Sequence, residues 1–498
     1  MKKLLVVLLS LGLIVAFGAT ASAVDVKFSG GYYVVGVYDN NPEFQKSNGY
    51  SRAAFFQRIR VQMEFVVAEG LSMTGRFDAL EKQWGNTDSR SMVWQDSTLS
   101  SRTDQDKTNS RVYATQGSAA SSTTGLVSET GKPIQENIEF ERAFITFKTA
   151  LGQFDVGYQL ADKWGTDFGD SESTRPRIKF TTQTGPFTFL AVYEKVFESD
   201  TSQVLPVAGL TTASPASATA LSYAYRNLTD ADADNYFLAG IYSFKGGQAG
   251  LLYKNVQNSM QRAYLLTAAT APFKTEVMAL VPYFKVTVGP VYLEGEATYA
   301  FGKAAKFDSN TNLVSLDKES WNAYMKARVD MGPAYFGGQV GWVQGDGDNA
   351  TKDTTGGDGG YDWKPTLILN NVDYATWLPN GKDSGLTNTY KNDPKGFLLY
   401  NIFGGVNPTP KLNMEAAISF VSYDTKKTWN TTRTAQTARV SADIGTEVDV
   451  TATYKIYDNL TYMVGAGYIF TGAAWKGTNP ANEVGDNYML LNKLTLSF

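Results

Sequence analysis

A short stretch of the chain, residues 164–180 (WGTDFGDSESTRPRIKF), places carboxylates directly before cationic side chains. Acids and bases that face each other across a narrow aqueous path create a transverse field, which orients water and dipolar solutes and discourages apolar ones. The alternative is a solvated surface loop whose charges pair with one another. The carboxylates, with one residue just upstream, are Asp162, Asp167, Asp170 and Glu172, and the bases are Arg175, Arg177 and Lys179.

Catalytic and metal chemistry is restricted, because the 498-residue chain contains no histidine and no cysteine. Histidine is the commonest general base and metal ligand, so Ser-His sites, His-ligated zinc and haem attachment motifs cannot be built from this sequence. We therefore expect no enzymatic activity and no cofactor. The acidic excess, 49 acidic against 45 basic side chains, gives no reason to expect nucleic acid as a partner.

The first residues, MKKLLVVLLSLGLIVAFGATASA, have the features of a secretory signal peptide: two lysines, an apolar run and an Ala-Ser-Ala ending. We expect residues 1–23 to be removed, which leaves residues 24–498 as the mature chain; a retained membrane anchor is the alternative. Beyond residue 23, no run approaches the roughly 18 apolar residues of a membrane-spanning helix. A mature membrane protein with this sequence must therefore be a barrel.

Polar and apolar residues alternate along most of the mature chain, which is typical of β-strands. In AFFQRIRVQMEFVVAEG (residues 54–70), Arg58 and Arg60 share one face while Ile59 and Val61 share the other. The same division recurs in residues 290–302, 319–332 and 446–457. A soluble antiparallel sheet could show this pattern too, so the connections between strands must decide between the two classes.

The connections alternate between tight turns and long polar segments. The tight turns are AEGL (68–71), TALG (149–152), TGPF (184–187), VGPV (288–291), MGPA (331–334) and YDNL (457–460). The long segments, rich in Ser, Thr, Asp, Asn and Gly, are roughly 85–135, 199–234, 303–318, 346–394 and 425–441. Short turns at one rim and long loops at the other predict an all-β transmembrane antiparallel barrel with short periplasmic turns and long external loops.

Pairing the strands around the tight turns predicts about 18 strands, with 16 also possible, and a barrel of this size encloses an aqueous channel. Alternation begins almost at residue 24, so no segment is left for a plug domain. The last strand, NYMLLNKLTLSF, ends the sequence on Phe498.

The signal peptide, the alternating strands and the aromatic terminus together resemble a bacterial outer-membrane porin of the general diffusion type. The resemblance implies that Phe498 is an assembly signal for the barrel-assembly machinery. It also implies an outer-membrane location, contact with outer-membrane lipid and lipopolysaccharide, and a homotrimer. In that family a segment such as residues 85–135 can latch onto a neighbouring subunit.

A narrower likeness concerns residues 141–172, ERAFITFKTALGQFDVGYQLADKWGTDFGDSE, in which an Arg-bearing strand and a tight glycine turn precede an acidic Phe-Gly loop. In general diffusion porins the third external loop folds into the barrel and faces a ladder of arginines. The resemblance therefore makes residues 162–175 a candidate constriction; ordinary lining of the lumen is the alternative. It implies an acidic loop of Asp162, Asp167, Asp170 and Glu172 and a basic wall of Arg58, Arg60, Arg76 and Arg142, to which Arg177 and Lys179 add charge.

Elementary energetics independently orient two of these arginines. Arg58 and Arg60 lie opposite the apolar Ile59 and Val61, and a charge on the lipid face near the midplane costs about 2–4 kcal/mol, so both should project into the lumen.

We expect a passive diffusion channel for small hydrophilic solutes and ions. A substrate-selective channel for sugars or anions and a surface-display barrel are the alternatives, and the mixed lumen charges leave the sign of ion selectivity open. Residues 345–360, GDGDNATKDTTGGDGG, resemble a calcium loop in composition but lack the EF-hand spacing, so we expect a surface loop there and no metal.

Overall fold

The computed structural model describes residues 25–42, 44–47, 49–84, 138–198, 232–260, 273–307, 314–357, 359–369, 394–430 and 433–498. The predicted signal peptide and the predicted long loop 85–135 lie outside these residues, as does most of 199–234. Within the described ranges, a single short 3-10 helix, η3 (Ala473–Lys476), is present, and no helix is long and apolar enough to cross a membrane.

The wall is built from long β-strands. They are β1 (Asp25–Asn40), β2 (Ser51–Ala68), β3 (Leu71–Gln83), β4 (Ile138–Thr149), β5 (Gly152–Ala161), β6 (Ser173–Thr184), β7 (Phe187–Phe197), β8 (Ala233–Phe244), β9 (Gly247–Asn258), β10 (Phe273–Val288), β11 (Val291–Phe307), β12 (Leu316–Met331), β13 (Ala334–Val343), β15 (Phe397–Thr409), β16 (Leu412–Ser422), β19 (Asp443–Tyr457), β20 (Leu460–Thr471) and β21 (Asn487–Ser497). Three short strands lie in connections: β14 (Lys352–Asp353), β17 (Lys427–Trp429) and β18 (Gln436–Ala438).

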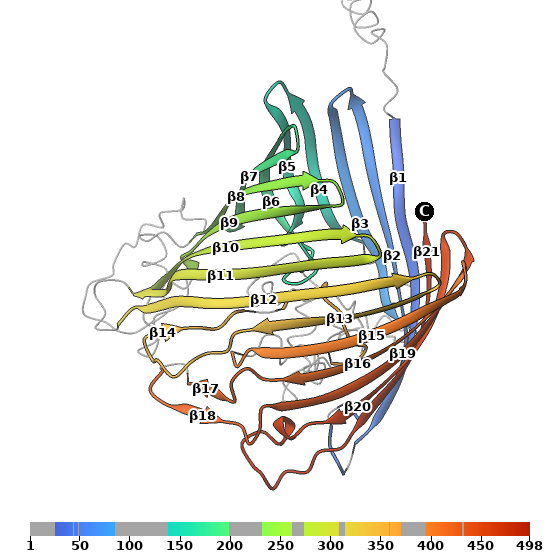
Figure 1. The fold of residues 1–498 in the computed structure, drawn as a ribbon. Helices are drawn as coiled ribbons and strands as arrows, with labels where there is room; N and C mark the ends of the chain where they lie inside the picture. Colours follow the sequence, from blue (N-terminus) through green and yellow to red (C-terminus); the bar gives the residue numbers. More distant parts are fainter. Residues whose placement is uncertain are drawn as a thin grey trace, which may run out of the picture.

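Each wall strand pairs antiparallel with the next, and the first strand pairs with the last. Gly31 of β1 lies opposite Ser497 of β21, and this ladder continues to Asn40 opposite Tyr488. Figure 1 shows the blue β1 beside the red β21, where the sheet closes. The described residues therefore form a closed antiparallel barrel of 18 strands, which confirms the larger of the two predicted counts.

The tight turns lie where the sequence predicts them. Turns such as Ala68 to Leu71 and Thr184 to Phe187 join consecutive strands through two residues. In both turns a glycine adopts a positive φ, 75° at Gly70 and 55° at Gly185, which other residues adopt only with strain. All these turns share one rim with the two chain ends of the barrel, and the longer connections share the other rim.

The two faces of the wall differ sharply in polarity. On β12, Met325 is 50% exposed on the outer face while its neighbour Tyr324 is 5% exposed inside. On β19, Val450 is 51% exposed outside and Asp449 is 5% exposed inside. This arrangement confirms the face assignments made from alternation, and an apolar outer belt around a polar interior is the pattern of a barrel that spans a membrane.

The lumen contains a packed group of side chains that the strands alone do not supply. Phe168, Trp363 and Leu369 lie in non-strand connections, yet they are 2%, 3% and 0% exposed. They belong to one buried cluster with wall residues such as Phe397 and Leu399 of β15. Two connections therefore enter the barrel, and these connections position the candidate site.

Candidate functional site

The connection between β5 and β6, residues 162–172, crosses the lumen and is called the inward loop below. Its Phe168 ring stacks on the ring of Tyr324 on β12, with the centroids 5.1 Å apart and the planes 11° apart. Since β12 lies far around the barrel from β5 and β6, the contact shows that the loop reaches across the interior. The loop that the sequence marks as a candidate constriction thus does fold inward.

Polar contacts hold the same loop against β10 and β11. The backbone N–H and the hydroxyl of Thr166 both donate to Oε2 of Glu296, at 2.8 and 3.0 Å. The indole Nε1 of Trp164 donates to the carbonyl oxygen of Val281 at 3.0 Å. Between them, Gly165 has a φ of 67°, and a Cβ atom there would lie 2.5 Å from Oε2 of Glu296, so only glycine permits this approach.

A second connection also enters the lumen: residues 359–369, called the inward segment below. The indole Nε1 of Trp363 donates to Oε1 of Gln339 on β13 at 2.9 Å. Further along, the backbone N–H groups of Ile368 and Leu369 donate to the two carboxylate oxygens of Glu447, at 2.6 and 2.8 Å. The sequence predicts this segment to be part of an external loop (346–394), and the structure corrects that prediction: the apolar run from Leu367 to Leu369 is buried, and such a run is a signal for packing.

The inward loop and the inward segment contact each other. The backbone N–H of Gly169 donates to the carbonyl oxygen of Gly359 at 3.2 Å, and that of Asp362 donates to the carbonyl oxygen of Asp170 at 3.0 Å. The edge of the Trp363 ring meets the Phe168 ring, with centroids 5.1 Å apart. Together the two connections form one packed unit inside the barrel.

Glu447 offers a direct test of how the inward segment is held. In an Ile368→Cys background, adding Glu447→Ala is expected to speed labelling of the cysteine by a water-soluble maleimide about tenfold or more, because two buried N–H groups lose their acceptor. The natural chain has no cysteine, so the label reports on this position alone. Glu415→Ala is the matched control, since Glu415 on β16 accepts from Tyr335 and leaves the segment untouched. Equal labelling rates in all three proteins would contradict this role of Glu447.

Among the four predicted acids, Glu172 is the one that faces the arginines of β2, β3 and β4. Burial by itself raises the pKa of Glu172. The nearby cations Lys163, at 3.5 Å, Arg142, Arg60 and Arg76 lower it by more, so the pKa lies below its ordinary value. Glu172 is therefore ionised at neutral pH and places a negative charge opposite a basic wall.

The other three acids have different surroundings. Burial raises the pKa of Asp162, but Lys254, the Ser173 hydroxyl and Arg175 hold it below its ordinary value, so Asp162 faces β6 and β9 and not the predicted wall. Asp167 is exposed on the loop. Asp170 is 4% exposed and accepts the backbone N–H of Trp164 at 2.6 Å, so it stabilises the conformation of the inward loop itself.

Asp170 should make the inward loop sensitive to pH. Burial raises the pKa of Asp170 to about 8, despite the Trp164 N–H and Lys163; Asp362 and Asp167 raise it further. The folded loop therefore keeps a proton that an opened loop loses near pH 4, so the stability of the closed loop falls as pH rises from about 4 to about 8.

We expect single-channel conductance of the wild type to become larger or noisier between pH 6 and pH 9. Asp170→Asn retains a carbonyl acceptor for Trp164 and cannot ionise, so its conductance should stay nearly constant over this range. If the asparagine variant kept the full pH dependence of the wild type, another group would have to be responsible.

Most of the arginines predicted to form a basic wall lie in ion pairs. Arg60 makes two hydrogen bonds of 2.7 Å to the carboxylate of Asp78, its neighbour across the β2–β3 ladder. Arg58 lies 3.2 Å from Glu81, and Arg76 lies 3.1 Å from Glu141. The wall therefore consists of alternating charges fixed by ion pairs, not of unopposed cations.

The remaining predicted bases occupy other parts of the wall. Arg142 is the register partner of Arg76, and its buried Nε has no hydrogen-bond partner within the described part of the chain. Arg177 on β6 pairs with Glu194 at 3.0 Å, and Lys179 pairs with Asp155 at 2.8 Å. The structure thus brings Arg60, Arg76 and Arg142 near Glu172, with Arg58 beside Arg60 on β2, and gives the two β6 bases separate acidic partners.

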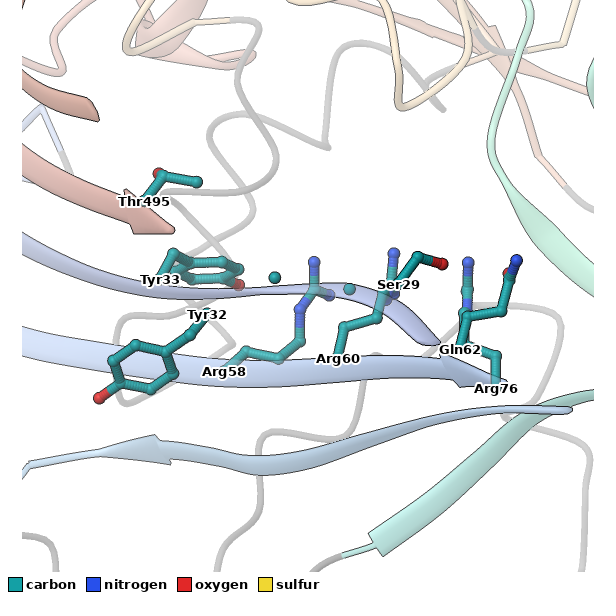
Figure 2. Close-up of a pocket in the computed structure, with 10 residues that line it drawn as sticks. Ser29, Tyr32, Tyr33, Arg58, Arg60, Gln62, Arg76 and Thr495 are labelled. Carbon is teal, nitrogen blue, oxygen red and sulfur yellow. The ribbon is translucent and has the colours of Figure 1, made fainter. Parts of the chain in front are cut away.

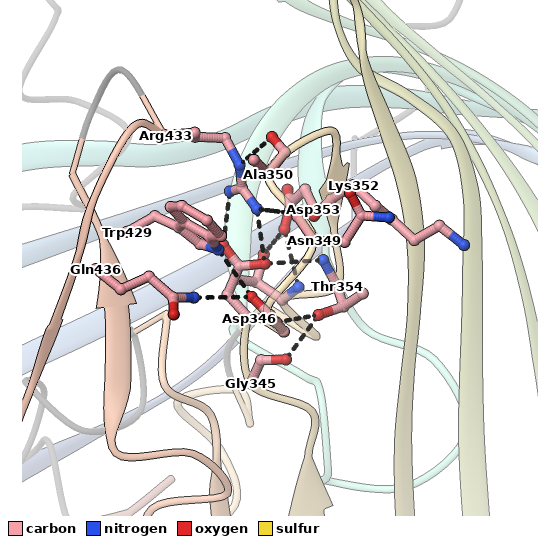
Figure 3. A network of polar contacts seen from close by, with 12 residues as sticks. Gly345, Asp346, Asn349, Ala350, Lys352, Asp353, Thr354, Trp429, Arg433 and Gln436 are labelled. Atoms are coloured by element: carbon pink, nitrogen blue, oxygen red, sulfur yellow. Dashed lines mark hydrogen bonds and ion pairs between the residues drawn. The ribbon is translucent and has the colours of Figure 1, made fainter.

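The calcium-like composition of residues 345–360 has a different explanation. Arg433, from the connection between β18 and β17, donates to both carboxylate oxygens of Asp346 at 2.6 and 3.1 Å (Figure 3). It also donates to the carbonyl oxygens of Asn349, Ala350 and Lys352. A guanidinium thus supplies the positive charge at this turn, and the described residues contain no group of three or more side chains suited to a metal ion. The contact ties the β13–β15 connection, which carries the inward segment, to the β16–β19 connection.

Comparison with known proteins gives similarity in fold alone. No protein-family model matches the sequence, and no curated protein matches it either. Among solved structures the chain is similar to OccK8 (OprE) of Pseudomonas aeruginosa (10% identity, 95% of this chain and 98% of that chain, TM-score 0.46). It is also similar to an anion-selective porin from Comamonas acidovorans (10%, 95% and 99%, TM-score 0.40) and to OmpT, an outer-membrane protein of Vibrio cholerae (10%, 96% and 99%, TM-score 0.36). Matches at this level carry no functional argument.

Proposed function

We propose that the protein is a passive diffusion channel for small hydrophilic solutes and ions in a bacterial outer membrane. The observation that carries the proposal is a closed 18-strand barrel with an apolar outer belt, whose charged interior is narrowed by the inward loop and the inward segment. A barrel of this size has a lumen wider than its own inward side chains can fill.

The charges beside the constriction suit passage of water and polar solutes. Glu172 and Lys163 are exposed on the inward loop, and Arg60 and Asp78 form an ion pair on the wall that Glu172 faces. Opposed fixed charges orient water across the passage and make it unfavourable to apolar solutes. Because the chain contains no histidine and no cysteine, we propose that it acts by conduction and not by catalysis.

Liposome swelling tests this proposal against its alternatives. Reconstituted protein should admit small neutral sugars at rates that fall steadily with molecular size. If sugars of equal size entered at different rates, the protein would be a sugar-selective channel and not a passive one. A well-folded protein that admits no solute would favour a barrel that only displays its external loops.

Phe498 is proposed to act in assembly as well as in closure. Its backbone N–H and carbonyl pair with Gly30 of β1, at 3.1 and 2.8 Å, so it completes the seam of the barrel. Its ring is 52% exposed on the outside, where the assembly machinery can reach it. Removing Phe498 should lower the amount of folded protein in the outer-membrane fraction severalfold, whereas Phe498→Tyr should preserve it. Normal assembly of the truncated chain would refute the proposed signal.

Export and oligomerisation complete the proposal. We propose that residues 1–23 direct the chain to the outer membrane, where the barrel contacts lipid and lipopolysaccharide and assembles as a homotrimer. N-terminal sequencing of the mature protein and light scattering of the detergent-solubilised protein test these two points. A mature chain that keeps residues 1–23, or a monomeric mass, would contradict them.

A further inference from the structure

The inner wall contains a recess of about 340 Å³ where β1, β2, β3 and β21 lie side by side. Figure 2 shows the side chains of Arg58, Arg60 and Arg76 projecting to the same side of these strands, whereas Tyr32 points to the opposite side. Gly31 occupies the position opposite Arg60 in the β1–β2 ladder, and its missing side chain leaves room beside the arginines. The recess is therefore a concave, basic surface on the lumen side.

Charged donors in this recess are not fully used by the protein. Arg76 is 5% exposed, and only its Nη2 atom pairs with Glu141, at 3.1 Å. Within the described residues, the buried Nε atoms of Arg76 and Arg58 have no hydrogen-bond partner. Buried donors normally find acceptors, and guanidinium donors prefer carboxylate oxygens. A ligand carboxylate in the recess would therefore meet guanidinium groups whose donors the protein uses only in part.

The charge balance around the recess favours a ligand of low charge. Three arginines, Arg58, Arg60 and Arg76, are offset by three carboxylates on β3 and β4: Asp78, Glu81 and Glu141. Two further cations lie nearby, since Nζ of Lys493 lies 4.9 Å from the centre of the Tyr33 ring and Arg142 is the register partner of Arg76. Glu172, which faces this wall, offsets one of them and leaves an excess of one positive charge. A single negative charge matches this excess.

Neutral polar groups complete the lining. Ser29, Gln62 and Thr495 offer two hydroxyls and an amide, which pair with hydroxyl groups of a ligand. The Tyr33 ring borders the recess and has Arg58 over it at 5.0 Å and Lys493 at 4.9 Å, both within the range of a cation–π contact.

We propose that this recess is a binding subsite for a small hydroxylated carboxylate that carries one negative charge. The proposal rests on the channel function proposed above and narrows it, because the subsite lies on the wall that the inward loop faces through Glu172. Solutes of this class pause at the arginines while they cross the lumen, and neutral polyols of the same size do not.

Current recordings in planar bilayers test the subsite, with gluconate as the probe and uncharged sorbitol as its size-matched control. Gluconate, but not sorbitol, should reduce the chloride current of the wild type in a saturable way. In Arg76→Gln the gluconate concentration for half-maximal reduction should rise about tenfold or more, which is the loss expected for a hydrogen bond to a charged group. Ser29→Ala/Thr495→Val, which keeps every charge, should raise it about threefold, as expected for the loss of neutral hydrogen bonds.

Arg328→Gln is the matched control, because Arg328 on β12 is an arginine remote from the recess that pairs with Asp330. This variant should keep wild-type sensitivity to gluconate. Open channels that gluconate does not affect, or that Arg76→Gln and Arg328→Gln change equally, would overturn the subsite and leave the channel intact. Equilibrium dialysis of labelled gluconate with the folded protein in detergent measures the subsite even without conduction: saturable binding weakened by Arg76→Gln supports it, and no binding overturns it. A wild type that binds gluconate but conducts no ions would overturn only the channel.

Discussion

Replacing residues 164–170 with a Gly/Ser segment of the same length is expected to raise the single-channel conductance about twofold or more, because the narrowest part of a pore dominates its resistance. The substitution removes the aromatic and polar anchors of the inward loop and keeps the spacing between β5 and β6. Without these anchors no contact holds the loop across the lumen, and the cross-section available to ions increases.

The inward loop is anchored by specific side-chain contacts of Phe168 and Thr166, so losing these contacts should release the loop from the opposite wall. Phe168 is packed between Tyr324 and Trp363, and truncation of a buried aromatic side chain costs about 3–5 kcal/mol. Thr166 contributes two hydrogen bonds to Glu296, whose carboxylate is 7% exposed and would otherwise be left without these donors. No comparable set of contacts exists for a Gly/Ser chain.

Single substitutions separate the loop from general damage to the barrel. Phe168→Ala should produce part of the increase in conductance and more frequent fluctuations of the current. Phe189→Ala removes an aromatic ring of 46% exposure from the outer face and should leave the conductance unchanged. Wild-type conductance in the Gly/Ser variant would show that the inward loop does not limit the passage.

Arg60→Gln is expected to increase the permeability of cations relative to anions about fivefold. The reason is that one unit charge at contact distance contributes about 1 kcal/mol to the energy of an ion even with full water screening. The substitution leaves Asp78, which is 3% exposed, without its bidentate partner on the wall that Glu172 also faces. Reversal potentials under a salt gradient measure this ratio.

The matched control removes the whole ion pair. Arg60→Gln/Asp78→Asn deletes one positive and one negative charge, so its selectivity should return close to that of the wild type. Arg328→Gln, which removes an arginine of β12 that pairs with Asp330, should have a smaller effect than Arg60→Gln. If the single and double variants had the same selectivity, the net charge at this point of the wall would not control ion passage.

The strands and turns could be predicted because their signals are local. Tyr324 and Met325 are neighbours that face opposite sides of one strand, and that alternation is visible in the sequence. Each tight turn is likewise a local signal: a stretch of four residues contains the glycine, Gly70 or Gly185, that adopts the positive φ. These local signals predict the barrel and narrow its number of strands to 18 or 16, of which the structure has 18.

The interior of the barrel could not be predicted in the same way, because its contacts join distant parts of the chain. Alternation within residues 446–457 predicts that Glu447 faces the lumen, but its partner Ile368 lies 79 residues earlier. The pairing of Arg60 with Asp78 depends on the register of β2 and β3, which an irregularity between Val66 and Ala68, next to the turn, shifts. Alternation predicts which side of a strand a charge faces, but the register and the inward connections decide what it meets.

The most direct test of the central claim is single-channel recording of the wild-type protein in a planar bilayer under a salt gradient. If the protein is a passive channel, we expect stable, long-lived open steps with a defined reversal potential, because a permanent aqueous path leads past the inward loop. Folded, heat-stable barrels that insert and show no conductance would contradict it, because the inward loop and the inward segment would then close the lumen completely.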